Sequence, residues 1–393
     1  MSMLADQIDW VIGVDTHRDR HALAVVDPTG GLRHERAIDA CAQGYEEALG
    51  VAEQLAPGRR AWAIEGAGSY GAGLTRHLMQ AGERVVEIER PVRQRRPGGA
   101  KSDPLDAVQA AREALARGQL AVPRQGTGRE ALRLLLATRA LAVTGRTAAI
   151  SQVKAFIVSA PDDLRAELRV LTTRAQLRRL AALRPHHGQA VDRRAIGIAL
   201  RSGARRALAL DDEARALEAE ICAIVERVAP ELLAVHGVGA IVAAQLLVSY
   251  SHPGRFRSEA AFASLAGVAP IPASSGQVVR HRLNRGGDRQ LNRAIRVVVL
   301  TRTRHCEKTR AYMARRRAEG RSTREAMRCL MRHVARGLFR LLTRIMSGQR
   351  SRSVTSTRAV PPATQSRSQM QPAAAIVARL VSGLHLEEAP SPA

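Results

Sequence analysis

Short apolar runs separated by polar turns fill the N-terminal part of the chain, and they constrain the fold more than any other feature. From Asp9 to Asp27 the sequence is DWVIGVDTHRDRHALAVVD, two apolar runs around a polar turn, which is typical of a β-hairpin. GGLRHERAI predicts a third strand. Then come a helix (GYEEALGVAEQLA), a buried strand ending in a Gly-rich turn (AWAIEGAGSYG), a helix (LTRHLMQAG), a strand (ERVVEIE) and a helix beginning near Asp103. This order predicts an α/β domain around a mixed sheet.

Strand signals vanish from about residue 128 to 234, where Leu, Ala, Ile and Val recur at helical spacing and Pro161 and Pro185 divide the region. Its last segment has one apolar stripe, which fits a coiled-coil arm or a core-facing helix: Leu217, Ile221, Ile224, Val225 and Val228. Because 393 residues exceed the usual span of one core, we expect several domains. We assign them to residues 1–125, 126–229 and 230–346, with a disordered basic tail at 347–393.

The third region begins PELLAVHGVGAIVAAQLL, a helix, the turn HGVG and a second helix. One interpretation is a helix-hairpin-helix, in which the amides of the turn at Gly237 and Gly239 face a phosphate. The other is a plain packing element of two helices.

The charge balance predicts a polyanionic partner. Lysine and arginine number 61 against 36 acidic residues, a formal net charge of +25. Arginine accounts for 58 of the 61, and its guanidinium suits bidentate contacts to phosphate and guanine. Aromatic residues are only 3% of the chain, so base stacking is not expected to dominate binding.

Other classes of protein find little support. The four cysteines form no CxxC pair, which argues against a zinc site or a disulfide framework and fits a reducing cytosol. The N-terminus lacks a signal-peptide pattern, and the longest apolar run is too short to span a bilayer. We therefore expect a cytoplasmic protein without a membrane partner.

Four carboxylates are candidates for a metal site. Asp15 and Glu65 each stand at the end of an apolar strand, where functional side chains collect in α/β sheets. Asp103 and Asp106 fall where a helix begins; there Asp103 can be the N-cap, and Asp106 can favour the helix dipole. Capping and metal binding are compatible roles. If the four converge, Mg²⁺ or Mn²⁺ would neutralise them, with Lys101 beside a phosphate.

A Pro-rich turn presents Ser274 and Ser275 before a dense set of basic residues: Arg280, His281, Arg282, Arg285 and Arg289. A hydroxyl in such surroundings can attack phosphorus. A polar turn without chemistry is the alternative.

Several of these motifs occur together, in order: VIGVDTHRDRHALAVVD, AIEGAGSYG, KSDPLDA, LLAVHGVGAIVAAQLL, and FASLAGVAPIPASSG with RGGDRQLNRAI. In this the chain resembles the DEDD-type insertion-sequence transposases, also called bridge-RNA-guided recombinases, from Val11 to about Met346. The resemblance implies a RuvC-like, ribonuclease H-class N-terminal domain whose acidic tetrad falls on Asp15, Glu65, Asp103 and Asp106. It also implies a catalytic serine at Ser275, with Ser274 as the alternative.

The same resemblance implies an oligomer that recombines donor and target DNA under the guidance of a structured RNA. We therefore expect a metal-dependent DNA transposase with a serine nucleophile. A junction nuclease in which water attacks, and a nucleic-acid-binding protein without catalysis, are the rival hypotheses.

Overall fold

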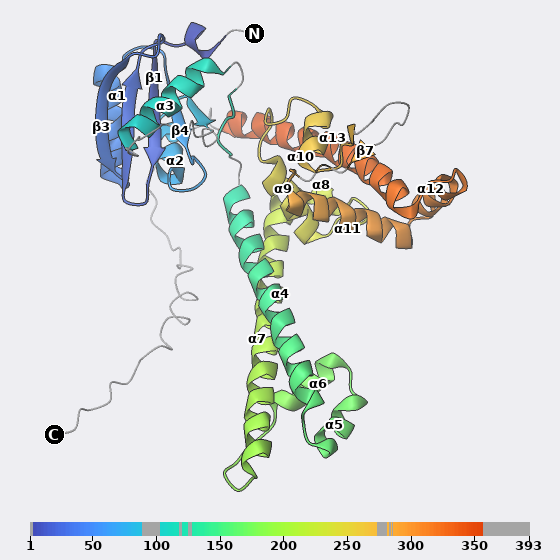
Figure 1. The fold of residues 1–393 in the computed structure, drawn as a ribbon. Coiled ribbons are helices and arrows are strands. Elements are labelled where there is room, and N and C mark those ends of the chain that lie inside the picture. Colours follow the sequence, from blue (N-terminus) through green and yellow to red (C-terminus); the bar gives the residue numbers. More distant parts are fainter. Residues whose placement is uncertain are drawn as a thin grey trace, which may run out of the picture. The chain divides into compact units, whose positions relative to one another are not determined.

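A five-stranded mixed sheet forms the N-terminal part of the protein in the computed structural model (Figure 1). The strands are β1 (Trp10–Thr16), β2 (Arg20–Val26), β3 (Leu32–Asp39), β4 (Arg60–Glu65) and β5 (Val85–Ile88). They lie in the order β3-β2-β1-β4-β5. Strand β2 is antiparallel to both of its neighbours, β1 and β3, whereas β4 is parallel to both β1 and β5. This is the strand order of the ribonuclease H fold, and the predicted α/β domain is confirmed.

The structure describes residues 3–88, 103–117, 120–124, 128–272, 281–282, 284 and 286–356. Among the predicted site residues, Lys101, Ser274, Ser275, Arg280 and Arg285 lie outside these ranges.

The two faces of the sheet carry separate cores, because successive side chains of a strand point to opposite faces. Ile12, Val14, Trp62 and Ile64 pack with α1 (Ala42–Leu55) and α2 (Ala72–Gln80). On the other face, small residues of β1, β2 and β4 pack with α3 (Asp103–Ala116) and the short helix η1 (Leu4–Asp6). The helix α3 lies across β1 and β2 (Figure 1).

Gly13 lets α3 approach β1 closely. A Cβ atom at Gly13 would lie 1.9 Å from the carbonyl oxygen of Ala107 and 2.8 Å from the amide nitrogen of Ala111. No side chain fits at those distances, so only glycine permits this backbone contact. The contact fixes where the first turn of α3 stands relative to the end of β1.

The region after the sheet is helical, as predicted, and it forms a hairpin. It is built of α4 (Arg129–Val158) and α7 (Val191–Val228), which lie side by side, with α5 (Asp162–Arg169) and α6 (Thr173–Ala181) between them in sequence (Figure 1). The breaks at Pro161 and Pro185 are confirmed. The predicted stripe of α7 faces the core, where Ile221 and Val225 are fully buried.

The next region is mostly helical. It comprises α8 (Pro230–Leu233), α9 (Ala240–Tyr250), α10 (Glu259–Leu265), α11 (Arg289–His305), α12 (Glu307–Ala318) and α13 (Thr323–Ser356), with two short strands, β6 (Ile271–Pro272) and β7 (His281–Arg282). Its core continues into α4 and α7. Three of the four phenylalanines of the chain, Phe256, Phe262 and Phe339, surround Tyr250 and join α9, α10 and α13.

The chain divides into two compact units after Ser347, but α13 continues beyond that point to Ser356. Of the tail predicted for residues 347–393, the part up to Ser356 belongs to α13, and the part from residue 357 onward lies outside the described ranges. None of the helices in the described part of the chain has both the length and the apolar content to cross a membrane.

The turn between β2 and β3 depends on Asp27. Its Oδ1 accepts hydrogen bonds from the amides of Thr29 and Gly31 at 2.9 Å and from the Thr29 hydroxyl at 2.6 Å. The guanidinium of Arg33 pairs with Oδ2 at 2.8 Å. The bonds from Thr29 and Gly31, with Arg33, lower the pKa of Asp27 to about 2. The side chain of Asp27 therefore serves to hold this turn together.

We predict that Asp27→Ala lowers the unfolding midpoint at neutral pH. The pKa of about 2 lies below the value of about 3.9 for an unfolded aspartate. The carboxylate therefore stabilises the fold fully above about pH 4, and this contribution is lost as the pH falls through 2. Urea unfolding at several pH values should show the gap between parent and variant closing below pH 4. Asp19→Ala, in the exposed turn after β1, is the control and should show no such gap.

Candidate functional site

Asp15 and Glu65 stand at the ends of neighbouring parallel strands. The register pairs Val14 of β1 with Ile64 of β4, so the acids occupy the next position of each strand. Val14 and Ile64 point toward α1 and α2. By alternation, Asp15 and Glu65 belong to the face that α3 covers. The hydroxyl of Thr16 donates to the carbonyl oxygen of Glu65 at 2.8 Å and ties the two strand ends together.

Asp103 and Asp106 lie in the first turn of α3. The helix includes Asp103 itself, one residue earlier than an N-cap at that position implies. Three residues apart, the two side chains share one side of the helix. Asp103 is exposed and Asp106 half-buried. The predicted helix start is confirmed, and the contact at Gly13 brings its first turn to the end of β1.

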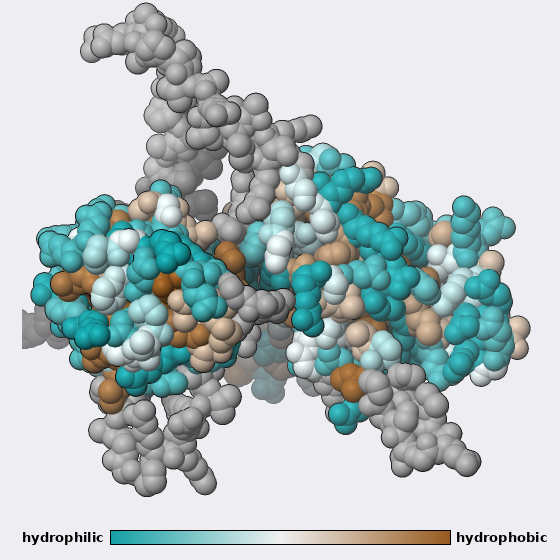
Figure 2. Space-filling model, turned by 90° about the horizontal axis from the view of Figure 1, so that it is seen from above, coloured by the Kyte–Doolittle hydropathy of each residue, from teal (hydrophilic) through white to brown (hydrophobic). Residues whose placement is uncertain are grey.

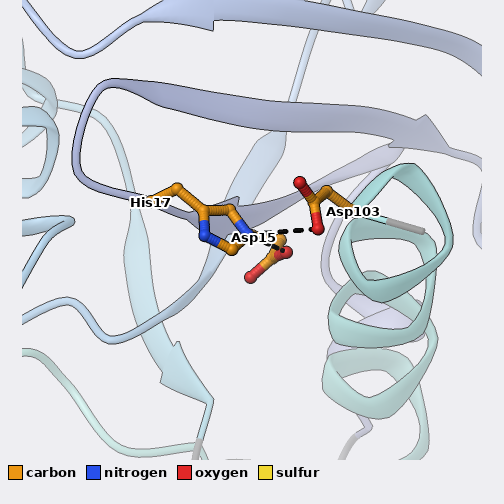
Figure 3. A group of neighbouring side chains, drawn as sticks. All are labelled: Asp15, His17 and Asp103. Atoms are coloured by element: carbon orange, nitrogen blue, oxygen red, sulfur yellow. Dashed lines mark hydrogen bonds and ion pairs between the residues drawn. The ribbon is translucent and has the colours of Figure 1, made fainter. Parts of the chain in front are cut away.

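His17 joins the two groups of acids (Figure 3). Its Nε2 lies 3.0 Å from Oδ2 of Asp15 and 3.2 Å from Oδ1 of Asp103. We did not predict a role for His17, because DTHRDRH reads as a polar turn. The available signal was alternation, since His17 follows Asp15 by two positions and so extends the same side of β1.

The negative charges of Asp103 and Asp106 disfavour the ionised form of Asp15. Burial raises the pKa of Asp15 above its ordinary value; His17 opposes this shift, and the charges of Asp106 and Asp103 add to it. Asp15 is only 8% exposed. A carboxylate held in such surroundings is stabilised by a nearby cation.

The donor atoms fit a divalent cation. One ligand atom each from Asp15, His17 and Asp103 lie within 4.8 Å of one another. Carboxylate oxygens suit Mg²⁺ and Mn²⁺, and an imidazole nitrogen suits Mn²⁺ and other transition metals. The structure thus unites Asp15 and Asp103, brings Asp106 into the electrostatic field of Asp15, and sets Glu65 on the adjoining strand.

The turn HGVG joins two helices, α8 and α9, as both interpretations of the sequence require. Gly237 has a φ of +84°, and a Cβ there would lie 3.1 Å from the carbonyl oxygen of Val298 in α11. Gly239 directly precedes α9. Arg302 donates from Nε to the carbonyl oxygen of His236 at 2.9 Å, which fastens the turn to α11. An open hollow lies beside the turn.

The predicted serine segment is described only at its borders. Strands β6 and β7 pair antiparallel, Ile271 opposite Arg282, and residues 273–280 between them lie outside the described ranges. Arg282 is exposed, as is Arg289 at the start of α11.

A ribonuclease H-like sheet, with acids at two adjoining strand ends and at the start of the helix that crosses them, defines the class of DEDD-type domains. Two family models match this chain. The model of a DEDD transposase covers residues 12–161, and that of the IS116/IS110/IS902 transposase family covers residues 229–314. The chain belongs to the IS110/IS116/IS902 family of transposases.

A curated relative comes from Streptomyces coelicolor and is described as an insertion element IS110 uncharacterized 43.6 kDa protein. It is 36% identical to this chain over 137 residues. The alignment spans about a third of each protein, 34% of this chain and 34% of the relative.

We predict that Gly13→Ala destabilises the sheet domain and weakens its affinity for divalent cations. The new methyl group must displace α3, because backbone atoms occupy its place. Overpacking of this kind costs about 1–3 kcal/mol, and the displacement separates Asp103 from Asp15. Chemical unfolding and calorimetric titration with Mn²⁺ measure the two effects.

Gly50→Ala is the matched control. Gly50 lies in α1, and a Cβ atom there meets nothing within 4 Å. That substitution should leave Mn²⁺ affinity unchanged and raise stability by about 0.5–1 kcal/mol, the helix preference of alanine over glycine. Equal unfolding and Mn²⁺ binding in Gly13→Ala and the parent would contradict the role of the close contact.

Proposed function

We propose that this protein is a DNA transposase that cuts and rejoins DNA strands at an acidic metal site. The observation that carries the proposal is the meeting of Asp15 and Asp103 around His17, at the edge of a ribonuclease H-like sheet in a chain of a transposase family. Transfer of phosphodiester bonds is the chemistry that clustered carboxylates with a divalent cation support.

Asp15, Glu65, Asp103 and Asp106 would hold Mg²⁺ or Mn²⁺. When bound, the cation supplies Lewis-acid stabilisation of negative charge on the reacting phosphate and on the leaving oxygen. The residues of the chain hold and orient it. Asp15 is fixed in the β1 ladder and shielded from water, whereas the more exposed Asp103 stands on the side open to a substrate.

Ser275, or its neighbour Ser274, is our candidate nucleophile. Its oxygen would bond to phosphorus while the bond from phosphorus to the 3′ oxygen of the DNA breaks, and the serine proton would end on that leaving oxygen. The phosphoserine bond conserves the energy of the phosphodiester, so a new 3′ hydroxyl can reverse the step and rejoin the strand. The exposed arginines Arg282 and Arg289 support binding of phosphate near this segment.

Donor DNA, target DNA and a structured guide RNA are the proposed partners, met in the bacterial cytosol and nucleoid. The excess of basic residues supports a polyanionic partner, and the face seen in Figure 2 is largely hydrophilic. Phosphate contacts would come from the turn at Gly237 and Gly239 and from the basic residues Lys101, Arg280, Arg282, Arg285 and Arg289.

The protein would act as a homo-oligomer, with a second copy covering one face of α4. Leu134 and Leu141 lie two turns apart on that helix, and 52% and 74% of their surfaces are exposed. Residues seven apart fall on one side of a helix, which is the spacing of a helical interface.

Recombination of matched donor and target plasmids, with and without the flanking RNA of the element, tests the function. We expect Asp15→Asn and Ser275→Ala each to reduce recombinant product by at least about a hundredfold, since each removes a group on which bond transfer depends. The parent should form a covalent adduct with DNA that Ser275→Ala does not form.

Different results favour the rivals. Hydrolysis of branched DNA by parent and Ser275→Ala alike would favour a junction nuclease. Unchanged activity in Asp15→Asn would favour a binding protein without catalysis. If Ser275→Ala retains the adduct and Ser274→Ala loses it, the nucleophile is Ser274.

We also predict that Leu141→Glu lowers the oligomeric mass measured by analytical ultracentrifugation while the helical circular dichroism stays unchanged. A charge at this exposed position leaves the fold intact but cannot be buried between two copies. Val158→Glu, at the end of α4 and 72% exposed, is the control. An unchanged mass in Leu141→Glu would contradict a second copy at this face.

A further inference from the structure

His17 is not one of the four predicted site acids, but its side chain lies between two of them. It follows directly after β1, and its Nε2 lies between carboxylates from two different elements, the end of β1 and the start of α3 (Figure 3). The distances are 3.0 Å to Asp15 Oδ2 and 3.2 Å to Asp103 Oδ1.

A hydrogen bond from His17 explains only one of these two short distances. A ring nitrogen carries at most one proton, so Nε2 can direct its N–H at one of the two oxygens but not well at both. A cation can be shared by all three atoms. Ligand atoms about 2.1 Å from a metal ion and at right angles to one another are about 3.0 Å apart, close to both separations here.

We propose that His17 Nε2 is a direct ligand of the divalent cation, together with Asp15 and Asp103. The site then has a nitrogen donor beside its oxygen donors. Mg²⁺ prefers oxygen ligands, whereas Mn²⁺ and other transition ions accept imidazole readily, so His17 biases the site toward Mn²⁺. The inference rests on the proposed function and adds the ligand that sets its choice of metal.

Pulsed electron paramagnetic resonance of one equivalent of Mn²⁺ bound to the full-length protein tests the ligand directly. We expect a coupling to a nitrogen nucleus in the parent, and this coupling should change when histidine is labelled with ¹⁵N. In His17→Gln the coupling should disappear. The Kd for Mn²⁺ from calorimetry should rise about tenfold or more in this variant, with a smaller rise for Mg²⁺.

His34→Gln is the matched control, because His34 lies in β3 opposite Val25, whose side chain belongs to the core on the α1 side of the sheet. This control should keep the nitrogen coupling and both affinities. Unfolding curves of the two variants show whether either substitution lowers metal affinity by destabilising the fold. The nitrogen coupling is measured in the parent protein itself, so this part of the test does not depend on the stability of a variant.

Two failures have distinct meanings. Mn²⁺ bound to the parent without histidine coupling, while recombination still requires Asp15, would overturn the role of His17 and leave the function standing. If the parent binds no Mn²⁺ at millimolar concentration and recombination does not require Asp15, both the ligand and the metal-dependent function are wrong.

Discussion

The close contact between Gly13 and the backbone of α3 determines the geometry of the acidic site. The helix rests directly on β1, with the carbonyl oxygen of Ala107 where a side chain would otherwise stand. Asp103 precedes Ala107 by about one turn, and Asp15 follows Gly13 by two positions of the strand, so one contact aligns both acids. The alanines that α3 turns toward the sheet keep this distance short along the helix.

Much of the sheet could be predicted from sequence because its signals are local. Alternation and turn residues identify the hairpin, and Asp27 marks its second turn through bonds to residues two and four positions away. The positions of Asp15 and Glu65 at strand ends follow from the same patterns. Their convergence needs one further step, the parallel pairing of β1 with β4, which a strand–helix–strand order favours.

The rest depended on tertiary contacts. An acid in the first turn of a helix is favourable whether or not it binds a metal, so the local pattern at Asp103 and Asp106 suited both interpretations. The approach of α3 to Gly13 brings that first turn to the end of β1, and no window of sequence contains this contact. His17 was missed because its neighbours are polar and turn-like. The helix α13 runs past Ser347 because serine and arginine are compatible with a helix, although their abundance suggested a tail.

Asp15 and Asp103 differ from other acids of the sheet domain in their ion-pair partners. Elsewhere in the sheet domain several acids pair with arginines: Asp9 with Arg59, Asp27 with Arg33, and Glu83 with the mostly buried Arg60. Within the described residues, no arginine or lysine lies within ion-pair distance of Asp15 or Asp103, whose one such partner is His17.

In the described part of a chain with 58 arginines, these two acids thus pair with a histidine and not with a guanidinium. An arginine there would neutralise the acids permanently and block the approach of a phosphate. A divalent cation would neutralise the same acids and could still bind oxygens of a substrate. Among the described residues, Asp15 and Asp103 therefore keep the unneutralised charge that a divalent cation would require, even in a protein with a net charge of +25.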